Sequence, residues 1–165
     1  MDRDRLLLAA PALACAGLLA FGYYLQYFEG QDPCPLCLVQ RGFYYGVLIV
    51  FAAAALHLPG RSGKWTYCGA ATVLALGGFG VAARQVWLQH LPPDQVPACG
   101  PDLFFMIENF PLSRMLQKLF LGSGQCAEVN WRFLGLSIAE WSLAWFAVLA
   151  LYAVCLGLQR ESHAR

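Results

Sequence analysis

Two cysteines two residues apart are the part of this sequence best suited to chemistry. Cys34 and Cys37 stand in the stretch QDPCPLCLVQR, where a very apolar chain becomes polar for a few residues. A disulfide within C-x-x-C closes too small a loop to stabilise a fold much, because that stabilisation grows with loop length. The usual use of this spacing is thiol–disulfide exchange. The pair therefore predicts a redox role.

The residues around the pair favour a reactive thiol. Pro35 suits the first turn of a helix, so we expect a helix that begins at Cys34 or Pro35. Free amide groups and the positive end of the helix dipole favour a thiolate there. Arg41 follows Cys37 by one turn on the same face. A charge inside an apolar segment is costly unless it faces a polar site, which makes Arg41 a functional candidate; snorkelling to the interface is the competing interpretation.

The other five cysteines divide by their surroundings. Cys99 and Cys126 lie in a longer polar segment, whereas three lie in apolar stretches, where we interpret them as packing residues: Cys15, Cys68 and Cys155. Four cysteines in polar segments could bind zinc, but Cys99 and Cys126 are too far apart in the sequence to form a second close pair. We therefore predict no metal site.

The composition indicates a membrane protein. Of 165 residues, 59% are hydrophobic and 13% charged, and the mean hydropathy is +0.52. Windows of about 20 apolar residues, long enough to cross a bilayer, occur four times: Leu6–Phe28, Cys37–Leu58, Trp65–Leu88 and Leu136–Leu158. The first is too long for a signal peptide. We predict an all-α membrane protein, a four-helix transmembrane bundle that forms one domain over residues 1–165. The net charge of +1 gives no indication of nucleic-acid binding.

The basic residues predict the orientation of the bundle. Lys and Arg flank the spans at both termini and between the second and third spans: Arg3, Arg5, Arg61, Lys64, Arg160 and Arg165. The positive-inside rule makes these segments cytoplasmic. The loops 29–36 and 89–135 then lie on the opposite side of the membrane, and if that side is the periplasm or its equivalent, disulfides persist there. Those loops and their borders hold Cys34, Cys37, Cys99 and Cys126.

Between Cys99 and Cys126, the stretch FPLSRMLQKLFLG has a helical pattern of apolar residues. These are Leu112, Met115, Leu116, Leu119 and Phe120. The pattern predicts a short amphipathic helix in the second periplasmic loop, lying on the membrane surface or packed on its own bundle.

A thiol pair that is oxidised and reduced needs an electron acceptor. The chain has neither a C-x-x-C-H haem attachment site nor a G-x-G-x-x-G fingerprint. The acceptor is therefore expected from outside the polypeptide, and at bilayer depth a lipid-soluble quinone is available.

Three stretches of the sequence resemble the DsbB family of bacterial inner-membrane proteins of disulfide bond formation. They are CPLCLVQR from Cys34 to Arg41, WLQHLP from Trp87 to Pro92, and GQCAEVNWRFLGLSIAEW from Gly124 to Trp141. The last is the most specific, and the three follow the family's order from the first span to the fourth.

The resemblance implies a thiol:quinone oxidoreductase. Such an enzyme reoxidises a DsbA-like periplasmic thiol oxidase and passes two electrons to ubiquinone or menaquinone in the surrounding membrane lipid. It further implies the disulfides Cys34–Cys37 and Cys99–Cys126. Cys99 would exchange with the partner and release Cys126, which would then engage Cys34. Cys37 and Arg41 would contact the quinone.

Two alternatives compete with this interpretation. An enzyme of the vitamin K epoxide reductase type is disfavoured, because the C-x-x-C here opens the second span near the N-terminus. The other is a non-catalytic membrane scaffold whose loops are held by two structural disulfides. Gln40, next to Arg41, could serve the same site or only mark the boundary of the apolar segment. Gln85 is at the place where members of the family can carry a His near the quinone, and we assign it no role.

Overall fold

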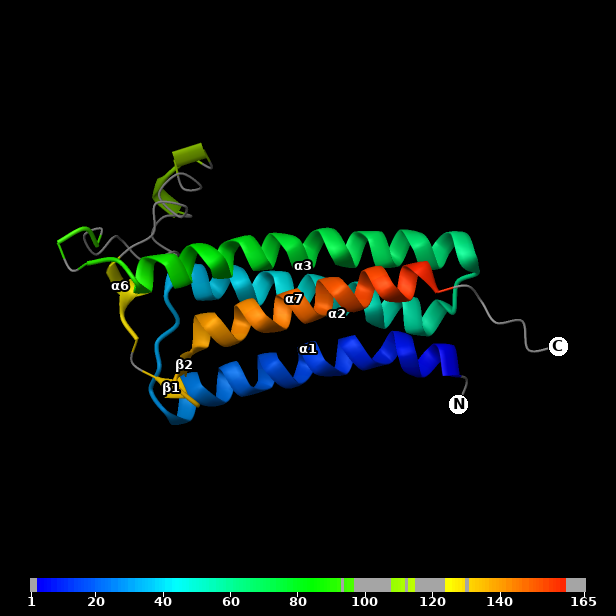
Figure 1. The fold of residues 1–165 in the computed structure, drawn as a ribbon, viewed down its shortest axis with the longest axis horizontal. Coiled ribbons are helices and arrows are strands. Elements are labelled where there is room, and N and C mark those ends of the chain that lie inside the picture. The colour runs from blue at the N-terminus through cyan, green and yellow to red at the C-terminus, as the bar shows by residue number, and fades with distance from the viewer. Residues whose placement is uncertain are drawn as a thin grey trace.

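The computed structural model describes residues 3–92, 94–96, 108–111, 113–114, 124–129 and 131–159. Four long helices lie side by side (Figure 1): α1 (Arg3–Phe28), α2 (Pro35–His57), α3 (Arg61–Gln89) and α7 (Ile138–Leu158). A short helix, α6 (Gly124–Ala127), and a two-stranded hairpin, β1 (Arg132–Phe133) and β2 (Leu136–Ser137), precede α7. Cys99 and most of the predicted amphipathic helix lie outside the described residues.

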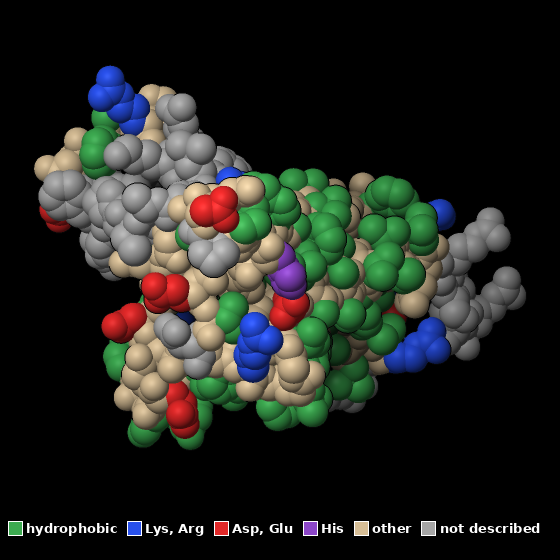
Figure 2. Space-filling view, turned by 60° about the vertical axis from the view of Figure 1, so that its left-hand side comes forward, with side chains coloured by type: hydrophobic (Ala, Val, Ile, Leu, Met, Phe, Trp, Pro, Cys, Tyr) green, Lys and Arg blue, Asp and Glu red, His purple; other side chains and the backbone are tan. Residues whose placement is uncertain are grey.

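The four long helices have the length and composition of membrane spans. Their most apolar segments have mean hydropathies between 1.4 and 2.0. Large apolar side chains project outward from every one of them, among them Leu13, Ile49, Val73 and Leu151, each more than 60% exposed. Figure 2 shows hydrophobic side chains covering much of the helical part on the face drawn. An apolar outer surface of this extent suits lipid, and the predicted all-α fold with four spanning helices is confirmed.

Loops and helix ends divide between the two ends of the bundle. The start of α1, the end of α7 and the α2–α3 connection lie at one end, whereas α6 and the hairpin lie at the other (Figure 1). Packing is closest between α3 and α7, between α1 and α2, and between α2 and α3. The pair α1 and α7 is not among these closely packed pairs.

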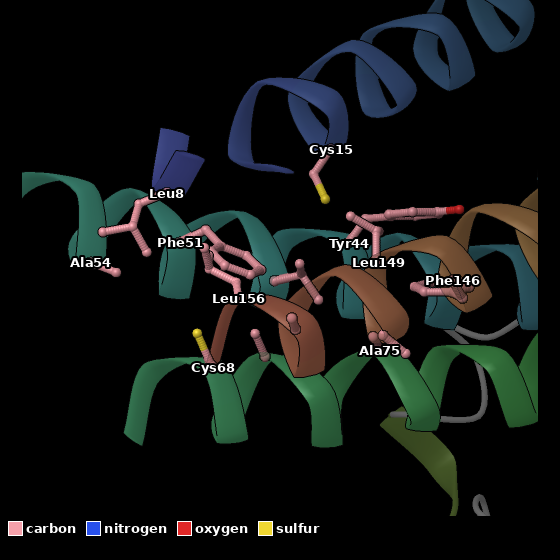
Figure 3. Close-up of a cluster of buried hydrophobic side chains, with 14 of the residues drawn as sticks. Leu8, Cys15, Tyr44, Phe51, Ala54, Cys68, Ala75, Phe146, Leu149 and Leu156 are labelled. Carbon is pink, nitrogen blue, oxygen red and sulfur yellow. The ribbon is translucent and has the colours of Figure 1, made fainter. Parts of the chain in front are cut away.

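One hydrophobic core joins the four helices. Figure 3 shows Cys15 from α1 and Cys68 from α3 among its members, together with Phe51 from α2 and Leu156 from α7. Both thiols are buried, as expected of packing residues. Cys155 was expected to pack as well, and this is wrong: it lies exposed on the side of α7. A small thiol is tolerated there because an outer position in a lipid-facing helix needs only an apolar group.

Glycines let α3 approach its neighbours closely, as the small residues of its sequence predict. A Cβ atom on Gly78 would overlap the Phe146 ring of α7, and one on Gly77 would lie 2.6 Å from Phe43 of α2. Phe146 is fully buried and stacks on Tyr44 with ring centroids 4.2 Å apart. The ring therefore has little freedom to retreat from a larger side chain at position 78.

The two helices nearest the hairpin end begin with defined caps. α2 begins at Pro35, within the predicted positions, and the Cys34 sulfur accepts a hydrogen bond from the Cys37 amide as its N-cap. α7 begins with a capping box, in which the Ser137 hydroxyl and the Glu140 carboxylate each accept from the other's amide. The hairpin turn just before it has positive φ at Leu134 and Gly135, as a two-residue turn of type I′ requires.

We predict that Gly78→Ala lowers the thermal unfolding midpoint of the purified protein in detergent. The added methyl group overlaps the buried Phe146 ring, and overpacking of this kind costs about 1–3 kcal/mol. Gly80→Ala is the matched control, because nothing lies within 4 Å of its Cβ position. A midpoint for Gly78→Ala equal to or above that of Gly80→Ala would contradict the packing described here.

Candidate redox site

Three of the four cysteines singled out from the sequence meet at the hairpin end of the bundle. The Cys34 and Cys37 sulfurs lie 3.1 Å apart, and Cys126 of α6 forms a side-chain hydrogen bond with Cys34. All three are free thiols in this structure. Cys34 therefore stands between two possible disulfide partners, its neighbour in C-x-x-C and a cysteine far along the chain.

The surroundings of these sulfurs are apolar and close. Cys126 is fully buried and Cys34 is 8% exposed, in a cluster with Leu36, Val81 and Leu88 from α2 and α3. The hydrogen bond with Cys126 raises the pKa of the Cys34 thiol far above its ordinary value, and the hydrogen bond with Cys37 and burial raise it further. Cys34 in the reduced protein is thus held as a thiol at neutral pH.

Two buried glutamines lie beside the sulfurs, and one of them, Gln85, contacts the sulfurs directly. Gln85 of α3 is 4% exposed, and its Nε2 donates to the sulfurs of Cys37, at 3.2 Å, and Cys34, at 3.4 Å. Gln40 of α2 is 3% exposed and donates from Nε2 to Gln85 Oε1 at 2.6 Å. The sequence alone assigned these residues no role. The available signals were a polar residue on an apolar helix, the position of Gln40 beside Arg41, and the position of Gln85 where members of the family can carry a His.

Arg41 lies one turn beyond Cys37 on α2 and is held against α1. Its guanidinium donates to Gln26 Oε1 and, at 3.0 Å, to the Gly22 carbonyl. It also lies over the Tyr23 ring, 4.7 Å from the centroid. A half-buried cation is stabilised by such contacts, and they fix Arg41 in the wall of a cavity.

This cavity has a volume of about 490 Å³ and lies beside the C-x-x-C pair. Cys37, Arg41 and Gln85 line it together with apolar residues of α1 and aromatic residues of α2 and α7: Leu18, Leu19, Leu25, Tyr44, Trp141 and Trp145. A largely apolar cleft with a few convergent polar groups is the usual form of a small-molecule site.

The hairpin closes one side of the cavity and was not predicted from the sequence. Trp131 contacts Phe21 of α1 edge to face, and Phe133 packs between Trp131 and Trp141 of α7. The Trp141 indole also donates to the Phe133 carbonyl at 3.1 Å. These contacts bridge α1 and α7, and all four aromatic side chains line the cavity. The alternating aromatic residues before Leu134–Gly135 were the available hairpin signal.

The chain matches the family model for "Disulfide bond formation protein DsbB" over residues 4–156. It is 52% identical over 134 residues to Disulfide bond formation protein B of Hahella chejuensis, covering 81% of each chain. It is 49% identical over 158 residues to the protein of that name from Polaromonas naphthalenivorans, covering 94% of this chain and 92% of the relative. The chain, a multi-pass membrane protein, therefore belongs to the DsbB family.

Proposed function

We propose that this protein is a thiol:quinone oxidoreductase that sustains disulfide bond formation. Membership of the DsbB family supports the disulfide-forming role. The finer proposal is that the protein oxidises a periplasmic thiol oxidase of DsbA type and passes the two electrons to ubiquinone or menaquinone. The observation that carries it is the placement of Cys34 against both Cys37 and Cys126, beside a cavity that also exposes Arg41.

The cysteines act by successive disulfide exchange. The partner's thiolate attacks Cys99 of a Cys99–Cys126 disulfide, and Cys126 leaves as a thiolate with the electron pair of that bond. Cys126 then attacks Cys34, so that a Cys34–Cys126 bond forms, the Cys34–Cys37 bond breaks, and Cys37 becomes the thiolate. The partner's second thiol then displaces Cys99, and the oxidised partner leaves. Cys99 attacks Cys126, so that the Cys99–Cys126 bond re-forms and Cys34 is released, which leaves Cys34 and Cys37 both reduced. The hydrogen-bonded contact of Cys34 and Cys126 supports this order of events.

The residues around the cavity fit a quinone. When bound, a quinone would supply the acceptor for the two electrons and two protons that Cys34 and Cys37 lose as their disulfide re-forms. The Arg41 guanidinium would hold an oxygen of the ring and stabilise negative charge on it, and Tyr44, Trp141 and Trp145 would pack on its apolar surfaces.

The proposed location is the bacterial inner membrane, with both termini in the cytoplasm. The basic residues Arg61 and Lys64 lie at the start of α3, at the end of the bundle where α1 starts and α7 ends. The positive-inside rule makes this end cytoplasmic. The sulfurs then lie at the periplasmic end, within reach of a soluble thiol protein.

We call the disulfide exchanges and the reduction of the quinone the relay. It predicts that the purified full-length protein reduces a quinone when a reduced DsbA-like protein is added. Quinone reduction is measured by the absorbance change of the quinone. Cys37→Ala and Cys99→Ala are expected to abolish it, because each breaks the chain of exchanges. Cys155→Ala, exposed on α7 away from the site, is the matched control. Reduction that persists in either of the first two variants would exclude this mechanism, and no reduction by the unmodified protein would favour the non-catalytic scaffold.

Arg41→Ala is expected to raise the apparent KM for the quinone about tenfold, since a hydrogen bond to a charged group contributes roughly 1.5–3 kcal/mol. The rate of disulfide exchange with the partner should not change. This rate is measured by trapping the mixed disulfide. Arg84→Ala serves as the control, because Arg84 stacks on Trp87 and does not line the cavity. An unchanged KM in Arg41→Ala would refute the role given to the guanidinium.

The pH dependence of Cys34 alkylation tests the contact with Cys126. A raised pKa moves the midpoint of the alkylation profile to high pH, and the hydrogen bond with Cys126 is the largest cause. In the reduced protein, Cys126→Ala should therefore move the Cys34 midpoint downward by at least about one pH unit, equivalent to about 1.4 kcal/mol. The profile is measured with iodoacetamide and peptide mass spectrometry, and Cys15→Ala is the control. An unmoved or higher midpoint would argue against the contact.

A further inference from the structure

The glutamine pair formed by Gln85 and Gln40 has no part in the exchange steps described above. Both amides are buried at the level of the sulfurs, and they come from different helices, α3 and α2. Burial of two uncharged amides at the edge of a membrane span is costly unless their hydrogen-bonding groups are satisfied. Their partners are each other and the sulfurs of Cys34 and Cys37.

The hydrogen bond between the two glutamines fixes the orientation of the Gln85 amide. Gln40 Nε2 donates to Gln85 Oε1 at 2.6 Å. With its oxygen held in this way, Gln85 directs its NH2 group at the sulfurs. The distances are 3.2 Å to Cys37 and 3.4 Å to Cys34, within reach for a hydrogen bond to sulfur. Gln85 is therefore placed as a donor to whichever of these sulfurs carries negative charge.

We propose that Gln85 is a catalytic hydrogen-bond donor to the Cys37 sulfur, and that Gln40 is a positioning residue that orients the Gln85 amide. The inference rests on the proposed function, because it concerns the exchange step of that reaction. When Cys126 attacks Cys34, the Cys34–Cys37 bond breaks and its electron pair goes to Cys37. The Gln85 NH2 group stabilises that thiolate as it forms, so the step needs no further reactant. A donor aimed in advance at a developing charge is effective because it need not reorganise.

Other titratable groups lie around Cys37 or line the same cavity. From α2 these are Arg41 and Tyr44, from the segment before α2 they are Asp32 and Cys34, and from α6 and the residues after it they are Cys126 and Glu128. Among the described residues of α1, α3 and α7 that line the cavity, none has a titratable side chain. Gln85 of α3 donates to the sulfurs and is uncharged. Its replacement by another uncharged residue therefore changes the hydrogen bond to Cys37 without changing the charges around it.

The test is the pH profile of Cys37 alkylation in the fully reduced, full-length protein, without quinone or partner protein. Iodoacetamide labelling is read out by peptide fragmentation, which separates Cys37 from Cys34. Gln85→Met keeps the length of the side chain but removes the donor. We expect its Cys37 midpoint to move up by about one pH unit, because a hydrogen bond to a charged group contributes roughly this much. At a given pH below the midpoint, this is about a tenfold loss of thiolate.

Gln40→Met leaves Gln85 in place and should move the Cys37 midpoint in the same direction by a smaller amount. This second variant keeps the proposal testable if Gln85→Met does not fold. Gln89→Met is the matched control: Gln89 lies one turn further along α3 and accepts from the Ser137 hydroxyl instead of contacting sulfur. Its Cys37 profile should equal that of the unmodified protein, and Cys155 provides an internal reference in every sample.

An unmoved or lowered Cys37 midpoint in Gln85→Met overturns the role of Gln85, and an unmoved midpoint in Gln40→Met overturns the role of Gln40. A shift shared by Gln89→Met would reveal a general change of structure and would likewise overturn the proposal. Because the assay contains neither quinone nor partner, its outcome is separate from that of the relay assay. If quinone reduction is not observed, a shift of the Cys37 midpoint would still support the hydrogen bond from Gln85. If the Cys37 midpoint does not shift, quinone reduction would still support the proposed function.

Discussion

The contact of Cys34 with Cys37 and Cys126 is the interaction on which the rest of the site depends. It requires α2 to begin at Pro35, so that the Cys34 sulfur caps the helix and lies 3.1 Å from Cys37. It also requires α6, which is distant from α2 in the sequence, to contact α2. One sulfur with two potential disulfide partners allows exchange with little movement of the surrounding helices.

The close approach of α3 supports this arrangement from the other side. Gly77 and Gly78 leave space for the rings of Phe43 and Phe146, and α3 therefore lies near both α2 and α7. Seven residues further along, Gln85 reaches the sulfurs across the same α2–α3 interface. Packing in the apolar core and hydrogen bonding at the redox site thus depend on the same helix–helix distance.

The cavity lies at the hairpin end of the bundle, between residues of all four long helices. At the hairpin end, α1 and α7 are connected through Trp131 and Phe133 of the hairpin region, and Arg41 is held by α1. Aromatic side chains can close such a space without filling it, because they are rigid and pack edge to face. The result is an apolar space that adjoins both Cys37 and lipid-facing helices.

The spanning helices, the start of α2 and the small-residue packing of α3 could all be predicted from the sequence. Each of these depends on local composition, proline chemistry or periodicity within one helix. Tertiary structure decided the contact of Gln40 with Gln85, the aromatic hairpin over the cavity and the outward position of Cys155. These depend on which face each helix turns to its neighbours, and in a uniformly apolar helix the sequence carries little periodicity to reveal that face. The proximity of Cys126 to Cys34 was implied only by family resemblance, because it joins residues from distant parts of the chain.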